Sequence, residues 1–401
     1  MSRLLVACGG SGDLVTAISF AATTSPGSVE AAAVRTGQPR VLTTLRPNGP
    51  QEGKNTSAGD VAVLATPVWE RFALDPRPGP RGPGDLIGLT DSPAGLQITS
   101  DTHLPGGFSP LPALSAASQL PVFYLSLAEG VVGLHRQLTS IVRWFEIDTV
   151  DLVDTGGDAL ARGDEPGLVS PALDALLIAA VTTLDCRTRL ICAGLGTDGE
   201  LSDREIHSLM VEIPAESQSR LDARQARSYY EQFSWVPSEA SLITLLSAIG
   251  LRGTVDVNDD CPPVRMDERT AVAYTFPLRP IAARSRYASA VAASTSFAQA
   301  DERLRAIGAR SEYRAELDRA VSPAPPPPTE PLDIRTAIDR ALPCGDYLSV
   351  RRLARAAGLN SREGLLYLER LLSQTLGSAY RRPLIGVRAT PASIDLEQKW
   401  Q

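Results

Sequence analysis

The sequence predicts an α/β fold with a mainly parallel, doubly wound sheet, followed by a small C-terminal helical unit that resembles a helix-turn-helix. Short apolar runs alternate with helical segments over residues 1 to about 280, and polar glycine loops follow these runs. A proline-rich stretch then interrupts the chain. We therefore expect an α/β domain at 1–318, a linker at 319–332 and a helical unit at 333–401.

The composition favours a folded protein without a membrane segment. The chain has 401 residues, of which 43% are hydrophobic and 21% charged, so a large core can form. No apolar run reaches the roughly 18 residues that span a bilayer. The N-terminus leads directly into a strand pattern and lacks the features of a signal peptide. A cytoplasmic protein is expected.

Several kinds of chemistry are excluded by residue type. Lys54 and Lys399 are the only lysines, which argues against a Schiff-base or phosphate-loop lysine. The three histidines and five cysteines show no metal-ligand spacing. Neither a bound metal nor a cofactor is assigned from the sequence. The net charge is −7, but the segment from Asp333 onward carries +4 and the remainder −11.

The first predicted elements flank a glycine loop. A strand over Leu4–Ala7 and a helix over Leu14–Ala22 enclose Gly10, Gly12 and Asp13. Glycines let backbone N–H groups approach an anion at a helix start, although the third glycine of the dinucleotide fingerprint is absent. Asp13 would suit a sugar hydroxyl or an amine. A simple tight turn is the alternative.

An arginine-rich loop follows the second predicted strand. Residues 23–60 are rich in Ser, Thr, Gly and Pro and are predicted as a long loop, and Val61–Ala65 as a strand. Arg71, Arg77 and Arg81 then lie on a segment stiffened by prolines. They could bind an anion in bidentate fashion or pair with the acidic loops described next.

The central stretch carries the strongest site signal. Residues 82–119 fit no regular pattern, whereas Val122–Leu127 is predicted as a strand and Val131–Phe145 as a helix. A buried strand at Thr149–Val153 and an apolar helix at Ala172–Leu184 come next. Four carboxylates lie between these last two elements: Asp154, Asp158, Asp164 and Glu165. The carboxyl edge of an open α/β sheet is where ligands bind, although a solvated acidic loop is the alternative.

A second acidic loop follows the predicted strand Arg189–Ala193. A capping box explains Ser202 and Glu205 but leaves Asp198 and Glu200 unexplained. Parallel strands place their carboxyl ends along one edge. We therefore expect the loops at 9–13, 155–165 and 196–200 to converge on one pocket.

The remainder is predicted as mixed elements and then helices. The expected elements are helices at Ser219–Phe233 and Ser238–Ile249, strands at Gly253–Val257 and Ala271–Phe276, and alanine-rich helix from Pro280 to Arg319. Beyond the linker, Ser349 and Ser361 should cap the helices Val350–Ala357 and Arg362–Leu372. This pair could contact nucleic acid or serve only for packing or dimerisation.

Several of these blocks together resemble one bacterial and archaeal family, the domain of unknown function numbered eleven fifty-two. The matching blocks are Gly-Gly-Ser-Gly-Asp at the N-terminus, Trp69-Glu70-Arg71, Asp75-Pro76, Gly79-Pro80-Arg81, Asp154 to Asp158, Gly163-Asp164-Glu165, Ser170-Pro171 and Asp198 to Leu201. They span roughly residues 1–210, and the family label implies no activity. The chain is also similar to the valanimycin-type transferases, which use an aminoacyl-tRNA as donor.

The favoured hypothesis is a group-transfer enzyme of secondary-metabolite (antibiotic) biosynthesis. It would move an aminoacyl group, with aminoacyl-tRNA as donor, to a small hydroxyl or amine acceptor. Asp158 or Asp198 would be the base, Glu200 and Asp164 would orient the acceptor, Arg71 or Arg81 would hold an anion, and Gly10, Gly12, Asp13, Asp154 and Glu165 would complete the substrate site. The basic C-terminal unit would contact the tRNA backbone.

Two alternatives remain open. A nucleotide- or sugar-dependent enzyme could use the same acidic pocket to bind ribose hydroxyls or Mg²⁺. A non-catalytic ligand sensor could use the C-terminal unit to read DNA, although the net charge of −7 disfavours this hypothesis.

Overall fold

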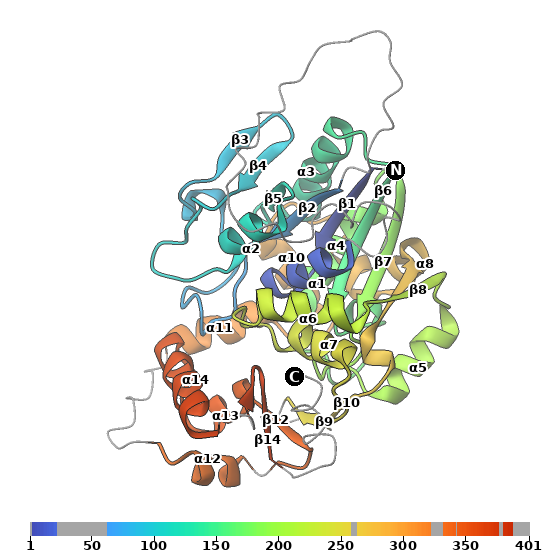
Figure 1. Ribbon diagram of the computed structural model, residues 1–401. Helices are drawn as coiled ribbons and strands as arrows, with labels where there is room; N and C mark the ends of the chain where they lie inside the picture. Colours follow the sequence, from blue (N-terminus) through green and yellow to red (C-terminus); the bar gives the residue numbers. More distant parts are fainter. Residues whose placement is uncertain are drawn as a thin grey trace.

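The computed structural model describes residues 2–21, 62–257, 263–321, 332–341, 343–376 and 380–387 (Figure 1). The predicted long loop at 23–60 and most of the predicted linker lie outside the described residues. Within the described residues, no helix has both the length and the apolar character needed to cross a membrane.

The structure confirms a mixed α/β fold with a large, parallel-rich sheet. Nine strands lie in the order β3-β4-β5-β2-β1-β6-β7-β11-β8. Their bounds are β1 Arg3–Ala7, β2 Ala62–Pro67, β3 Thr90–Ser92, β4 Gly95–Ile98, β5 Val122–Leu125, β6 Thr149–Thr155, β7 Arg187–Ala193, β8 Ser217–Arg220 and β11 Val272–Pro277. The five central strands, from β5 to β7, are parallel, and the outer strands on both sides pair antiparallel.

Helices cover both faces of this sheet, as the alternation of side chains along β1 requires. Leu4 and Val6 enter one core with α3 Gly130–Trp144, α4 Pro171–Thr182, α5 Asp203–Glu212, α8 Leu278–Arg284, α9 Arg286–Val291 and α10 Phe297–Ala306. Leu5 and Ala7 enter the other with α1 Ser11–Ala21, α2 Leu111–Ser118, α6 Ala223–Phe233 and α7 Glu239–Ile249. The sheet is therefore doubly wound.

The strand order creates one switch point, between β1 and β6. From β1 the parallel strands continue outward through β2 to β5, and from β6 they continue the other way to β7. The loops that leave β1 and β6 therefore turn to opposite faces of the sheet, toward α1 and α4 respectively. In open α/β sheets, ligands bind at such a switch point.

Two predictions in the second half of the chain are wrong in detail. Ser219 and Arg220 belong to β8, which pairs with β11, and the helix α6 begins only after its cap Asp222. The alanine-rich region is not continuous helix, because Ser285 and Ser296 cap new helices within it. A further helix, α11, covers Glu312–Val321.

The C-terminal segment contains the predicted helix pair together with strands that were not predicted. The helices are α12 Ile334–Arg340, α13 Val350–Ala356 and α14 Arg362–Leu376. Ser349 caps α13, and Ser361 accepts a hydrogen bond from Gly364 at the start of α14. A second sheet runs in the order β10-β9-β12-β14-β13, with β9 Gly253–Asp256, β10 Val264–Met266, β12 Tyr347–Ser349, β13 Tyr380–Arg381 and β14 Leu384–Gly386.

This second sheet joins the C-terminal segment to the preceding chain. β12 pairs in parallel with β9, and the hydroxyl of Tyr230 on α6 donates to the carbonyl of Arg382 at 2.6 Å. Tyr347 and Leu384 enter the same core as α6 and α7. The segment is therefore not purely helical, and it is packed against the α/β core.

Candidate functional site

The three predicted loops meet at the switch point of the sheet. The loop after β7 is bound to the loop after β6, because Gly196 N donates to the carbonyl of Gly156 at 2.6 Å. The loop after β6 contacts α1 through the hydroxyls of Thr155 and Thr16, 2.7 Å apart. These contacts bring the strand ends that precede the 9–13, 155–165 and 196–200 loops together, and the expectation that the loops line one pocket stays a prediction.

Asp154, Asp158 and Asp174 form a first group of carboxylates. One oxygen from each lies within 4.8 Å of the other two. Asp154 is the last residue but one of β6, Asp158 begins the short turn that follows, and Asp174 lies in the first turn of α4. Cys192 on β7 donates its thiol hydrogen to Asp154 at 3.3 Å. Asp174 was not predicted, although an acid within an otherwise apolar helix was a usable signal.

Asp158, Asp198 and Glu200 form a second group with the same spacing. Asp198 accepts a hydrogen bond from Glu200 N on one carboxylate oxygen, while its other oxygen is buried and has no hydrogen-bond partner. Glu200 also accepts from Val169 N and Ser170 at the start of α4. Asp158 belongs to both groups, so the two groups form one continuous acidic site.

Burial and mutual repulsion keep these carboxyl groups from ionising easily. Burial is the main cause that raises the pKa of Asp154 to about 6 and that of Asp13 to about 8, and Asp154 raises the latter further. The pKa values of Asp158, Asp174 and Asp198 are also raised, first by burial and then by neighbouring carboxylates. No arginine or lysine among the described residues forms an ion pair with this group.

Glu312 on α11 extends the acidic site. It accepts a hydrogen bond from Ala172 N at 3.4 Å, next to the start of α4. Burial raises its pKa to about 8, with Glu200 as the next cause. Nothing in the local sequence marks Glu312, since its helix reaches the site only through tertiary packing.

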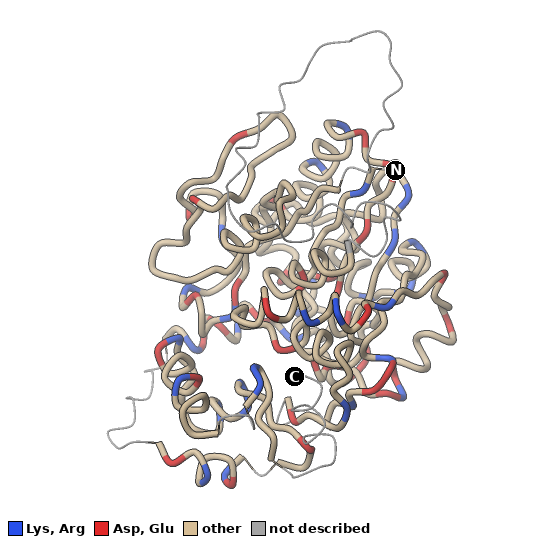
Figure 2. The backbone as a smooth tube through the Cα atoms, in the orientation of Figure 1, with Lys and Arg blue, Asp and Glu red and all other residues tan. Residues whose placement is uncertain are grey.

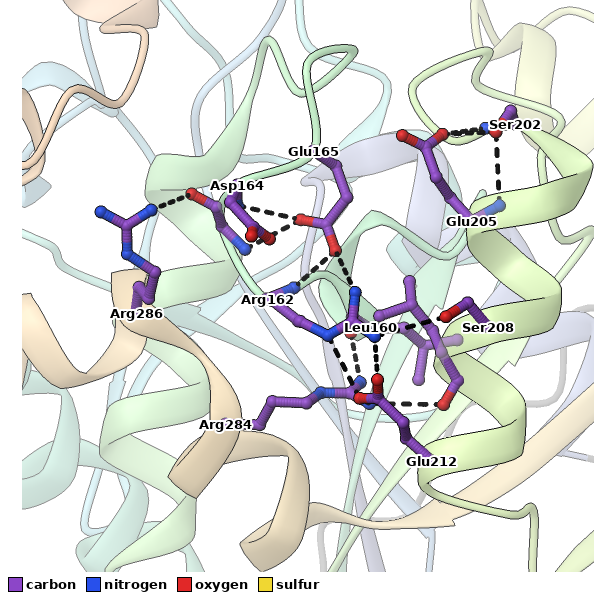
Figure 3. Close-up of polar contacts among 12 residues, drawn as sticks. Leu160, Arg162, Asp164, Glu165, Ser202, Glu205, Ser208, Glu212, Arg284 and Arg286 are labelled. Carbon is purple, nitrogen blue, oxygen red and sulfur yellow. Dashed lines mark hydrogen bonds and ion pairs between the residues drawn. The ribbon is translucent and has the colours of Figure 1, made fainter.

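The predicted residues Asp164 and Glu165 lie outside both carboxylate groups. Figure 3 shows that Glu165 organises its own loop, where it accepts hydrogen bonds from the backbone of Arg162, Gly163 and Asp164. Arg162 also pairs with Glu212 on α5, as Figure 3 shows. Asp164 is exposed.

The glycines of the first loop permit close packing. Gly10 has φ of +75°, and a Cβ there would lie 3.3 Å from the carbonyl oxygen of Trp69. A Cβ at Gly12 would lie 2.6 Å from the hydroxyl of Ser238. Asp13 accepts a hydrogen bond from Gly9 N at 2.5 Å and thereby closes the loop.

The three arginines of the loop after β2 differ in their surroundings. Arg81 is buried and pairs with Asp75 at 2.7 Å, and Arg77 pairs with Asp85 at 3.1 Å. These partners are local acids rather than the acidic loops at the switch point. Arg71 is exposed and has no hydrogen-bond or ion-pair partner among the described residues. Of the two arginines predicted to hold an anion, Arg71 alone presents an uncommitted guanidinium.

The carboxylate groups offer the ligands that a hard divalent cation prefers. Mg²⁺ and Ca²⁺ take oxygen ligands, and each group supplies three carboxylates at the same place. The nearby thiols of Cys8 and Cys192 do not compete, because burial raises their pKa and keeps them protonated.

The fold and the candidate site define a doubly wound α/β protein with a cluster of buried carboxylates at its switch point. The chain belongs to the family described as Protein of unknown function (DUF1152), whose model matches residues 52–320. No curated protein and no solved structure matches the chain.

Proposed function

We propose that this protein is a divalent-cation-dependent group-transfer enzyme that acts on a small molecule at the β1–β6 switch point. The observation that carries the proposal is the pair of carboxylate triads that share Asp158. Like charges at this spacing repel strongly in a partly buried site. A cation bound by their oxygens would remove that repulsion and would stabilise negative charge on a transferring group.

Asp13 belongs to neither triad and can move a proton. Burial raises its pKa to about 8, close to the operating range of a general acid or base. We assign to Asp13 the proton of the acceptor hydroxyl or amine. Glu200 also accepts a hydrogen bond from Ser170 and thereby holds the start of α4 against the site.

Aminoacyl transfer is a second candidate, and the charge of the site favours it. An acidic pocket suits the α-ammonium group of an aminoacyl donor and an amine acceptor equally well. Such a donor ester is already activated, so the protein needs only positioning and one base. The basic residues along the C-terminal helices, visible in Figure 2, would contact the tRNA backbone.

Cation binding provides the direct test of the first proposal. Mn²⁺ serves as the probe in calorimetric and paramagnetic titrations of the full chain, with Asp198→Asn as the test variant. We expect this substitution to weaken Mn²⁺ binding roughly 10–100-fold. Asp164→Asn is the matched control, because it removes the same charge from an exposed acid outside both triads. Equal Mn²⁺ affinity in the wild type and Asp198→Asn would overturn the cation site.

A donor assay separates the two candidates. The purified protein is offered an aminoacyl-tRNA, or free amino acid with ATP, each with Mg²⁺ and with EDTA. Product from the tRNA donor in EDTA supports aminoacyl transfer without a cation. Product only with Mg²⁺ and ATP supports the first proposal and identifies a nucleotide-dependent reaction.

A further inference from the structure

Arg71 occupies a defined place beside the start of α1. Its neighbour Glu70 is buried and accepts hydrogen bonds from Ser11 at 2.8 Å and Ser109 at 2.7 Å. The carbonyl of Trp69 packs against Gly10. The Arg71 backbone is therefore held against the first turn of α1, while its guanidinium is exposed and has no partner among the described residues.

The C-terminal segment places Arg351 near the first turn of α1 as well. Arg351 pairs with the buried Glu239 at 3.1 Å, and its backbone N–H donates to the same carboxylate at 2.8 Å. Glu239 opens α7, where Ser241 donates to the carbonyl of Gly12 at 2.8 Å. Arg355 lies one turn further along α13 and so shares the face of Arg351.

A second contact confirms that the C-terminal helices lie over this edge of the α/β core. The guanidinium of Arg362, at the start of α14, stacks on the ring of Phe108 at 4.7 Å. Phe108 N in turn donates to the carbonyl of Leu74, in the same loop as Arg71. The loop after β2 is thus faced by α13 and α14.

The three arginines bring positive charge together beside the start of α1. The pKa of Arg71 is lowered to about 10, first by the charge of Arg351 and then by desolvation, with a smaller contribution from Arg355. The two nearby acids are Glu70 and Glu239. Burial raises the pKa of Glu70 to about 7, so its carboxyl group is partly protonated near that pH value. At the start of α1, Leu14 N donates to the carbonyl of Gly10, whereas no acceptor among the described residues is found for the backbone N–H groups of Ser11, Gly12 and Asp13.

We infer that Arg71, Arg351 and Arg355 form a subsite for a phosphate group of the small-molecule substrate, built jointly by the α/β core and the C-terminal segment. Guanidinium groups bind phosphate through two parallel hydrogen bonds, and the N–H groups at the start of α1 add further donors. The inference rests on the proposed function, because the reacting end of that substrate would lie at the carboxylates that follow β6 and β7.

Phosphate binding can be tested without any cation or turnover. The full chain is titrated with inorganic phosphate and pyrophosphate in EDTA, and the variants Arg71→Gln and Arg355→Gln are compared with wild type. We expect each variant to weaken binding about tenfold or more, as loss of a charge-assisted hydrogen bond predicts. Arg136→Gln is the control for net charge, because Arg136 lies on the exposed side of α3. Circular dichroism verifies folding, and Arg71→Lys should bind with intermediate affinity.

Four results would overturn the subsite. Two concern the variants: full phosphate affinity in Arg71→Gln, and equal weakening in Arg136→Gln. The third is binding of tRNA by a wild type that does not bind phosphate or pyrophosphate, which would identify the arginines as a nucleic-acid contact. The fourth is tighter binding of acetate than of phosphate, which would identify the ligand group as a carboxylate. Asp198→Asn should retain phosphate binding and bind Mn²⁺ more weakly, so failure of the subsite and failure of the cation site are distinguishable.

Discussion

Asp158 is the residue on which the two carboxylate triads depend. Its carboxylate lies within 4.8 Å of oxygens of Asp154 and Asp174 in one group, and of Asp198 and Glu200 in the other. Its position after β6 follows from Gly157, which has φ of +99° and turns the chain back toward α4. A substitution at Asp158 should therefore affect both triads together.

We predict that Asp158→Asn abolishes Mn²⁺ binding and lowers turnover by roughly 10²-fold or more while the fold is retained. Asparagine keeps the size of the side chain but carries no charge and cannot act as a base. Titration and a single-turnover assay on the folded variant measure both effects. If Asp158→Asn bound Mn²⁺ as Asp164→Asn does, the shared role of Asp158 would be wrong.

A second residue, Asp151, is buried in the middle of β6 and has a structural role. It accepts hydrogen bonds from Arg3 on β1 at 2.9 Å and from Arg189 on β7 at 2.6 Å. One carboxylate thereby bridges guanidinium groups from the strands on both sides. Removing it takes away the negative charge that Arg3 and Arg189 share.

We expect Asp151→Ala to lower the free energy of unfolding by about 3–5 kcal/mol, the range for breaking a buried ion pair. Urea denaturation followed by circular dichroism measures this loss. Asp148→Ala is a suitable comparison, since Asp148 is an exposed acid just before β6 and its carboxylate accepts a hydrogen bond from Ser2 N. A loss below about 1 kcal/mol in Asp151→Ala would contradict the structural role.

At the scale of the elements, the loop after β6 and the loop after β7 pack closely against each other. Gly156 has φ of +128°, and a Cβ at this position would lie 2.2 Å from a carboxylate oxygen of Asp198. Glycine at 156 therefore allows Asp198 to reach the acidic site. The loops after β6 and β7 therefore lie close enough for their carboxylates to form one group.

Gly156→Ala should weaken Mn²⁺ binding about tenfold or more, because the new methyl group displaces Asp198 and strains the backbone. The affinity is compared with that of Gly84→Ala, where a Cβ would meet nothing within 4 Å. Unchanged affinity in Gly156→Ala would show that Asp198 does not bind the cation.

At the scale of the whole molecule, raised pKa values make stability depend on pH. The pKa values of Asp13 and Glu312 are raised to about 8, and that of Asp154 to about 6. In the unfolded chain these groups titrate near pH 4, so the folded state holds more protons between about pH 4 and 8. The free energy of unfolding should therefore fall as pH rises through that window and level off above pH 8.

We predict that the protein in EDTA is more stable at pH 6 than at pH 8.5, and that Mg²⁺ restores most of the loss at pH 8.5. A cation bound to the folded state alone stabilises it by mass action and favours ionised carboxylates. Thermal unfolding at both pH values, with EDTA or Mg²⁺, measures the effect. Greater stability at pH 8.5 in EDTA would contradict the raised pKa values.

Much of the fold and part of the site could be predicted from local sequence. The apolar run of β6 and the helical spacing of apolar residues in α3 are visible in the sequence, so the buried residues of these elements can be predicted from it. Asp158, Asp198 and Glu200 could be located because each follows an apolar strand, and parallel strands end at one edge. The switch point itself could not be read from the sequence, because it depends on strand order.

The tertiary structure decided the features that have no local signal. Asp174 and Glu312 reach the acidic site because α4 and α11 pack there, whereas Glu165 is turned into its own loop by nearby N–H groups. The short strands β8 and β12 depend on partners distant in the chain, so their sequences show little periodicity. The sequence by itself determined the residue types and the carboxyl edge on which they lie. Packing determined which of them meet, because long-range contacts place helices and short strands in ways that neighbouring residues do not encode.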